Sequence, residues 1–211
     1  MSRAKKLSLF IVFTLIFGII ALFHESRLGK WIDREVYEFI YASESFITTA
    51  LMLGFTQLGE VISMMVLSMI VIAILMLYRL NMHALFMLIS MLSSSILIPV
   101  LKFSFDRERP AFLRLIEITG FSFPSGHSLG STIFFGSLMV IIKNTNLNHK
   151  AVMYGLCAAF ILMICSSRVY LGVHFPTDIL AGMTIGTAVV FGVSALLHNK
   201  LKAPSPYVHK K

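Results

Sequence analysis

The chain has 211 residues, of which 57% are hydrophobic and only 13% are charged, far from the balance of an ordinary water-soluble domain. The net charge of +8 does not indicate a nucleic-acid partner, because the basic residues flank apolar runs instead of gathering on one polar face. The composition therefore excludes a typical soluble enzyme or DNA-binding domain. It predicts a single membrane domain over residues 1–211.

Six apolar runs are long enough to cross the roughly 30 Å hydrocarbon core of a bilayer, which takes about 17 to 25 helical residues. In chain order they are 7–23, 61–78, 84–101, 127–142, 151–167 and 179–197. The first run follows basic residues as a signal peptide would, but no small-residue cleavage site follows it, so we interpret it as an uncleaved anchor. The sequence thus predicts an all-α, polytopic membrane bundle of six transmembrane helices.

The segment between the first two runs, residues 24–60, is expected to hold short helices in the first external loop. Ile32, Val36, Phe39 and Ile40 share a helical face and acidic residues occupy other faces, which favours a helix lying in the membrane interface. A solvated loop with chance periodicity is the alternative. Residues 46–58 are apolar but too short to cross, so we expect them to enter and leave the membrane on one side.

The distribution of charge predicts the orientation. Six spans place both termini on one side, and that side carries ten of the 18 basic residues, which the positive-inside rule makes cytoplasmic. These ten are Arg3, Lys5, Lys6, Arg79, Lys143, Lys150, Lys200, Lys202, Lys210 and Lys211. The opposite side carries all ten acidic residues. We therefore expect a plasma-membrane protein with cytoplasmic termini and its polar motifs at the external face.

Three polar motifs lie at the external helix ends, at residues 102–110, 124–127 and 167–178. Short connections between spans bring such ends into one pocket. The motifs contribute three cations, Lys102, Arg109 and Arg168. The planar fork of arginine and the mobile charge of lysine suit a tetrahedral phosphate better than a carboxylate. The alternative is that these residues are ordinary positive charges flanking helix ends.

The second motif, Pro124-Ser125-Gly126-His127, has the residues of a helix start that binds an anion. Pro124 fits the first turn, Ser125 offers a hydroxyl and a backbone N–H, and Gly126 allows close approach. The helix dipole adds about half a positive charge. Ser125 and Gly126 are therefore candidate phosphate-binding residues, although Pro and Ser often merely begin a helix.

Two histidines complete the predicted site. His174 and Asp178 are four residues apart, so a helix starting near residues 175–177 brings them close together. The carboxylate can then hold one imidazole N–H and leave the other nitrogen free to attack phosphorus, whereas an isolated pair of this kind is more often a surface pair or helix cap. His127 is the candidate general acid, because the leaving group needs a proton.

Together, Lys-x6-Arg-Pro at 102–110, Pro-Ser-Gly-His at 124–127 and Ser-Arg-x5-His-x3-Asp at 167–178 resemble the tripartite motif of the type 2 phosphatidic acid phosphatase superfamily. The resemblance implies hydrolysis of a lipid phosphate in two steps, without metal or other cofactor. His174 would form a phosphohistidine, His127 would protonate the leaving group and Asp178 would orient His174. The phosphoryl oxygens would be held by Lys102, Arg109, Ser125, Gly126 and Arg168.

The short chain is most similar to bacterial members that act on phosphatidylglycerol phosphate, phosphatidic acid or undecaprenyl pyrophosphate. Other functions remain open from the sequence. A vanadium haloperoxidase shares the anion site but is mainly soluble and larger. A non-catalytic lipid-phosphate binding or transfer protein would tolerate loss of His174. A transporter would usually show paired repeats or broken helices near the membrane midplane.

Overall fold

The computed structural model describes residues 1–41, 44–111, 114–145 and 147–202. These residues form helices and no strand, so the predicted all-α class is confirmed. In chain order the helices are α1 (Arg3–Phe23), α2 (Arg27–Tyr41), α3 (Phe46–Leu58), α4 (Val61–Leu77), α5 (Asn81–Phe105), α6 (Gly126–Asn144), α7 (Lys150–Tyr170), α8 (Pro176–Leu196) and α9 (His198–Lys202). Lys210 and Lys211, which entered the charge argument, lie outside the described residues.

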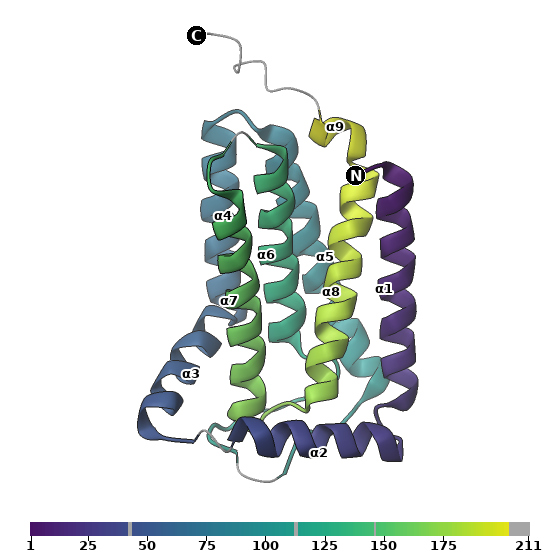
Figure 1. Ribbon diagram of the computed structural model, residues 1–211, viewed down its shortest axis with the longest axis vertical. Helices are drawn as coiled ribbons and strands as arrows, with labels where there is room; N and C mark the ends of the chain where they lie inside the picture. Colours follow the sequence, from purple (N-terminus) through teal and green to yellow (C-terminus); the bar gives the residue numbers. More distant parts are fainter. Residues whose placement is uncertain (42–43, 112–113, 146, 203–211) are drawn as a thin grey trace.

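The helix α6 lies at the centre of the bundle. It packs against α5, α7 and α8, and α1 covers the outer side of α8 (Figure 1). A Cβ atom at Gly182 would lie 2.7 Å from the carbonyl oxygen of Ser125, and one at Gly186 would lie 3.0 Å from that of Leu129. Glycine at these two positions therefore lets α8 lie directly against the first turns of α6. This close packing brings the second and third motifs together.

Several helices have the length and hydropathy of membrane spans. In the described part of the chain these are α1, α5, α7 and α8, and the bent pair α3–α4 is a fifth candidate if it counts as one span. The central helix α6 is outside this set, and buried hydroxyl residues such as Ser128, Ser131 and Thr132 lower its hydropathy. A helix surrounded by other helices can carry such residues, because it meets little lipid. Six spans therefore stay a prediction.

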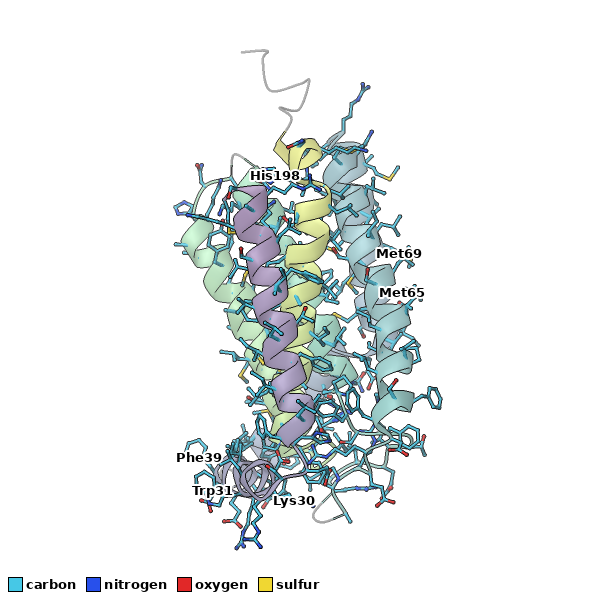
Figure 2. All side chains as sticks on the ribbon, turned by 90° about the vertical axis from the view of Figure 1, so that its right-hand side faces the viewer. Lys30, Trp31, Phe39, Met65, Met69 and His198 are labelled. Atoms are coloured by element: carbon cyan, nitrogen blue, oxygen red, sulfur yellow. The ribbon has the colours of Figure 1, made fainter. Side chains whose placement is uncertain are left out.

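The helix α2 lies across the end of the bundle at which the motifs meet (Figure 1). The structure thus has the predicted short helix rather than a solvated loop. Trp31 and Phe39 are 58% and 82% exposed and project from the outer side of α2 (Figure 2), as aromatic residues in a membrane interface do. The face packed on the protein carries the buried residues Asp33 and Tyr37, and Ile40 of the predicted apolar face is half-buried against the core beside them.

The short helix α3 leads into α4 through a bend of 57° at Gly59 and Glu60. α3 has 13 residues, too few to cross a bilayer alone, as the sequence indicates. It packs against α7 and stands away from the rest of the bundle in Figure 1. The bend therefore faces the end of α7 that carries Arg168. It places Thr56 and Glu60, which belong to none of the three motifs, next to the site.

Candidate active site

The three motifs meet at one end of the bundle, beside α2 (Figure 1). Lys102 is in the last turn of α5, and Arg109 follows in the long connection to α6. His127 is in the first turn of α6, Arg168 in the last turn of α7, and His174 just before α8. Residues separated by up to 72 positions in the sequence, from Lys102 to His174, are thus gathered at neighbouring helix ends, as the motif order predicts.

The pair of His174 and Asp178 has the geometry that its spacing predicts. Phe175 is the N-cap of α8 and Pro176 its first residue, which turns the chain so that His174 Nδ1 lies 3.3 Å from Asp178 Oδ2. On the other side of the ring, Arg109 Nη1 lies 3.1 Å from His174 Nε2. A carboxylate only accepts and a guanidinium only donates. The proton therefore belongs on Nδ1, and Nε2 carries the lone pair.

Burial keeps His174 neutral. The side chain is almost fully buried, and this desolvation lowers its pKa from 6.5 to about 3, although the neighbouring Asp178 acts in the opposite direction. Arg109 and Arg168 lower the pKa further by charge repulsion. An unprotonated imidazole at neutral pH is the form that can act as a nucleophile.

The carboxylate of Asp178 is fully buried and accepts hydrogen bonds from three donors besides His174. Its Oδ1 accepts a 2.6 Å hydrogen bond from Arg107 Nη1, and its Oδ2 accepts one of 2.9 Å from the backbone N–H of Phe175. The hydroxyl of Ser122 donates to the same Oδ2. Such a buried charge is stable only when paired and hydrogen-bonded. The network fixes the position of Asp178 and, through it, the orientation of His174.

Arg107 links the site to the interfacial helix α2. Its Nη2 lies 2.8 Å from Asp33 Oδ2, and Asp33 in turn accepts hydrogen bonds of 2.8 Å and 3.0 Å from the backbone N–H and the hydroxyl of Thr177. Thr177 is in the first turn of α8, where backbone N–H groups have no partner within the helix. Asp33 of α2 thus caps α8. The guanidinium of Arg107 also lies 4.1 Å over the ring of Phe175.

The three predicted cations are held in place by contacts within the protein. Lys102 Nζ donates to the carbonyl of Phe121 at 2.9 Å, and Arg109 donates to the carbonyls of Gly120 and Val173 at 2.9 Å and 2.8 Å. Arg168 has no exposed surface. These contacts fix the cations around the two histidines.

Part of the Arg168 guanidinium lacks a partner. Nη1 donates to the hydroxyl of Thr56, but Nε and Nη2 have no hydrogen-bond partner among the described residues, although both are buried. Buried donors are normally satisfied, and each exception needs a reason. An anion bound at this fork would satisfy both N–H groups with the bidentate geometry typical of phosphate recognition.

The start of α6 differs from the sequence prediction in one detail. Pro124 is not in the first turn, because α6 begins at Gly126 and Ser125 is its N-cap. The hydroxyl of Ser125 accepts from the backbone N–H of Ser128 at 3.4 Å, and the Ser125 backbone N–H donates to the carbonyl of Asp178 at 3.1 Å. The reason is local: a serine hydroxyl can cap a helix N-terminus, whereas proline cannot supply such an acceptor side chain. Gly126 is the first helical residue, where unpaired N–H groups favour an anion.

The structure also brings in residues that the sequence argument missed. Arg107 and Ser122 donate to Asp178, and Asp33 pairs with Arg107. Thr56 contacts Arg168, and Glu60 lies 3.2 Å from His127 Nε2. The sequence offered a reason to include Arg107 in the site, because it is a further cation two residues before Arg109. The remaining four belong to no recognised motif, and three of them lie on segments before the third predicted span.

The fold and the site together define an integral membrane protein whose buried, neutral histidine faces a cluster of fixed cations. The comparisons with known proteins agree with this description. The model of the PAP2 superfamily matches residues 83–202, more than half of the chain. The chain therefore belongs to the PAP2 superfamily, the family of phosphatases that the tripartite motif indicates.

Individual relatives are similar to this chain over different shares of its length. Phosphatidylglycerophosphatase B of Bacillus subtilis is 33% identical over 144 residues, which cover 67% of this chain and 71% of the relative. Undecaprenyl-diphosphatase of Sulfolobus acidocaldarius is 30% identical over 87 residues, covering 41% of this chain and 39% of the relative. The crystal structure of a transmembrane PAP2-type phosphatidylglycerolphosphate phosphatase from Bacillus subtilis superposes with a TM-score of 0.82 at 29% identity, covering 90% of this chain and 96% of that one.

Proposed function

We propose that this chain is a membrane lipid phosphatase that hydrolyses a phosphate monoester or a pyrophosphate through a phosphohistidine on His174. The observation that carries the proposal is the fork of Arg168, whose Nε and Nη2 are buried without a partner in the described part of the chain. Each unsatisfied buried donor costs about 1–3 kcal/mol. A phosphate with two oxygens on this fork removes that cost and lies beside the nucleophile.

In the first step, the lone pair of His174 Nε2 attacks phosphorus. An N–P bond forms while the bond from phosphorus to the leaving oxygen breaks, and His127 gives its proton to that oxygen. Asp178 holds the Nδ1 proton and stabilises the charge that develops on the ring. Arg109 contacts Nε2 in the structure. When the substrate binds, Arg109 donates to the phosphoryl oxygens instead and leaves the lone pair of Nε2 free. Fixed cations of this kind stabilise the charge on the transferring group.

In the second step, water attacks the phosphohistidine. The N–P bond breaks, its electron pair returns to Nε2, and the neutral His127 left by the first step accepts a proton from the water. Inorganic phosphate is the product, and both histidines return to their starting protonation states. Neither proposed step uses a metal ion. The described residues contain no group of three or more His, Cys, Asp or Glu side chains that could hold one.

A lipid substrate fits the surroundings of the site. A largely apolar groove of about 370 Å³ runs between α4 and α5 and reaches Gly59 and Gly126 at the active end. Met65 and Met69 line it and lie on the flank of the bundle (Figure 2), and methionine adapts readily to flexible apolar partners. The likeness to the Bacillus subtilis relative and to the Bacillus subtilis crystal structure supports phosphatidylglycerol phosphate as the first substrate to test, ahead of phosphatidic acid and undecaprenyl pyrophosphate.

We also propose six membrane spans, with α6 and the α4 arm of the bent pair crossing as separate helices. The termini would be cytoplasmic and the active site external, because six spans place both termini on the side that carries ten of the 18 basic residues. A cysteine introduced near the exposed residue Glu117 tests this orientation. An impermeant thiol reagent should label it in intact cells. The natural Cys157 and Cys165 are both buried and should contribute little background. Labelling only after lysis would reverse the orientation.

The test of function is phosphate release by the purified protein in detergent. We expect release from at least one of phosphatidylglycerol phosphate, phosphatidic acid and undecaprenyl pyrophosphate, with the same rate in excess EDTA. Loss of activity in EDTA that magnesium restores would contradict the metal-free mechanism. Binding of labelled lipid phosphate without any release would instead support a non-catalytic lipid-binding protein.

A further inference from the structure

The bend between α3 and α4 contacts both sides of the phosphate site. Thr56, in the last turn of α3, accepts a hydrogen bond from Arg168 Nη1. Glu60, which precedes α4, lies with its Oε1 3.2 Å from His127 Nε2. The side chain of Glu60 makes no capping hydrogen bond to α4, so its carboxylate is directed to the histidine of another helix.

Gly59 makes this contact sterically feasible. A Cβ atom at this position would lie 2.8 Å from His127 Cδ2 and 2.6 Å from Ile164 Cγ2. Both distances are below normal carbon–carbon contact, so only glycine lets the bend approach the imidazole this closely. The approach brings the carboxylate of Glu60 to the edge of the ring that carries Nε2.

We propose that Glu60 is a positioning residue that raises the proton affinity of His127 for its role as general acid, an inference that rests on the proposed function. The charged groups that face His127 are Glu60 from the bend, Arg168 from α7 and Lys102 from α5. Burial of the ring and the two cations disfavour the imidazolium form, and the carboxylate of Glu60 favours it. Without Glu60, burial and the cations that bind the phosphate would both disfavour the proton that the leaving group needs.

The geometry suits a proton that is stabilised and still transferable. Although Glu60 Oε1 is within ion-pair distance, His127 Nε2 has no aligned hydrogen-bond partner among the described residues. The contact with His127 is the largest cause that lowers the pKa of Glu60, so the carboxylate is ionised at neutral pH. Glu60 is about half exposed. It can therefore withdraw when the leaving oxygen of a substrate approaches the ring.

The decisive experiment compares E60Q with the wild type on two leaving groups, by single-turnover phosphate release. On a lipid monoester, whose alkoxide needs a proton, we expect about a 10-fold loss, less than the ~10² to 10⁴ of removing a general acid altogether. On p-nitrophenyl phosphate, whose leaving group needs no proton, the rate should stay within about 2-fold. The descending limb of the lipid pH profile should also move to lower pH, because the imidazolium loses its stabilising charge.

Three controls make the outcome specific. E60D, which retains the charge, should keep most of the lipid activity. E38Q, which removes an exposed carboxylate paired with Arg34 on α2, should match the wild type. The double variant H127A with E60Q should be no slower than H127A alone, because Glu60 acts only through His127.

Equal losses of E60Q on both substrates, or no loss on either, would overturn the role of Glu60 while leaving the phosphatase intact. A further loss in the double variant would do the same. If the wild type releases phosphate from neither substrate, the proposed function fails and the role of Glu60 fails with it.

Discussion

The two histidines of the site have different surroundings. His174 is almost completely buried, and its partner Asp178 is fully buried and bound by Arg107, Ser122 and the backbone of Phe175. The side chain of His127 is 12% exposed, and Glu60 beside it is 49% exposed. One histidine is thus held in a closed network, whereas the other contacts the half-exposed carboxylate of Glu60 on a bend.

The difference matches the demands of the two proposed roles. A nucleophile must keep one tautomer and one orientation through both steps, which requires several fixed contacts. A general acid and base must release a proton, recover it and admit water, which requires access and few fixed bonds. The comparison therefore predicts that changes around His174 act through geometry, and that changes around His127 act through protonation.

The largest effect is expected from H174A. No neighbouring group can accept the phosphoryl in its place, so turnover should fall by ~10⁴ or more on every substrate. The measurement is phosphate release together with a test for acid-labile phosphoprotein, which the variant should not form. Substantial turnover by this variant would rule out the covalent mechanism.

The next largest effect is expected from H127A, and it should depend on the leaving group. Hydrolysis of a lipid monoester should fall by ~10² to 10⁴, while p-nitrophenyl phosphate should retain much of its single-turnover rate. An equal loss on both substrates would contradict the acid role and indicate that His127 binds phosphate instead. This result would remove the contrast between the two histidines.

Arg168 tests whether the buried fork binds the phosphoryl group. R168Q keeps a polar side chain but removes the charge and the paired donors, so kcat should fall by ~10² to 10³. R168K keeps the charge and should recover only a small part of that loss, because lysine lacks the planar fork. R34Q, on the exposed face of α2, is the matched control and should behave as the wild type. Full activity of R168K would show that charge alone is sufficient.

Asp33 tests whether α2 supports the site through Arg107. D33N weakens the ion pair with Arg107 and the cap on α8, which should shift His174 slightly and lower kcat by about 10- to 100-fold. The exposed residue Glu35 supplies the control E35Q on the same helix. Loss of substrate affinity with an unchanged kcat would place Asp33 in binding rather than in the orientation of His174.

The smallest effect is one of pH on stability. Burial lowers the pKa of His174 from 6.5 to about 3, so below pH 6.5 the unfolded chain binds a proton that the folded chain resists. The contribution of His174 to stability is complete above pH 6.5 and declines as the pH falls toward 3. Each pH unit in that window costs up to about 1.4 kcal/mol.

The measurement is the melting temperature in detergent at pH 7 and pH 5, for the wild type and for H174Q. Between these two values the wild type should lose roughly 4 to 8 °C more than the variant, because glutamine does not titrate. Equal losses in the two proteins would show that His174 is readily protonated in the folded state. The closed network around it would then not protect its lone pair.

The sequence by itself determined the features that depend on local spacing. Apolar runs separated by polar turns indicated an all-α membrane protein, and the three motifs indicated the family. The four-residue interval and Pro176 sufficed to predict that His174 meets Asp178, because a helix start places such residues on one side of its first turn. The predicted position of Pro124 within α6 was wrong, because Ser125 supplies the cap that decides where that helix begins.

Only the tertiary structure decided which distant residues complete the site. Arg107 meets Asp33 across 74 positions and Arg168 meets Thr56 across 112, and neither pair has a periodic signal in the sequence. α6 shows the same limit, since its hydroxyl residues reduce its hydropathy and yet are buried by neighbouring helices. Local spacing constrains residues within a few turns, whereas buried polar contacts between distant segments form only where packing removes both partners from water.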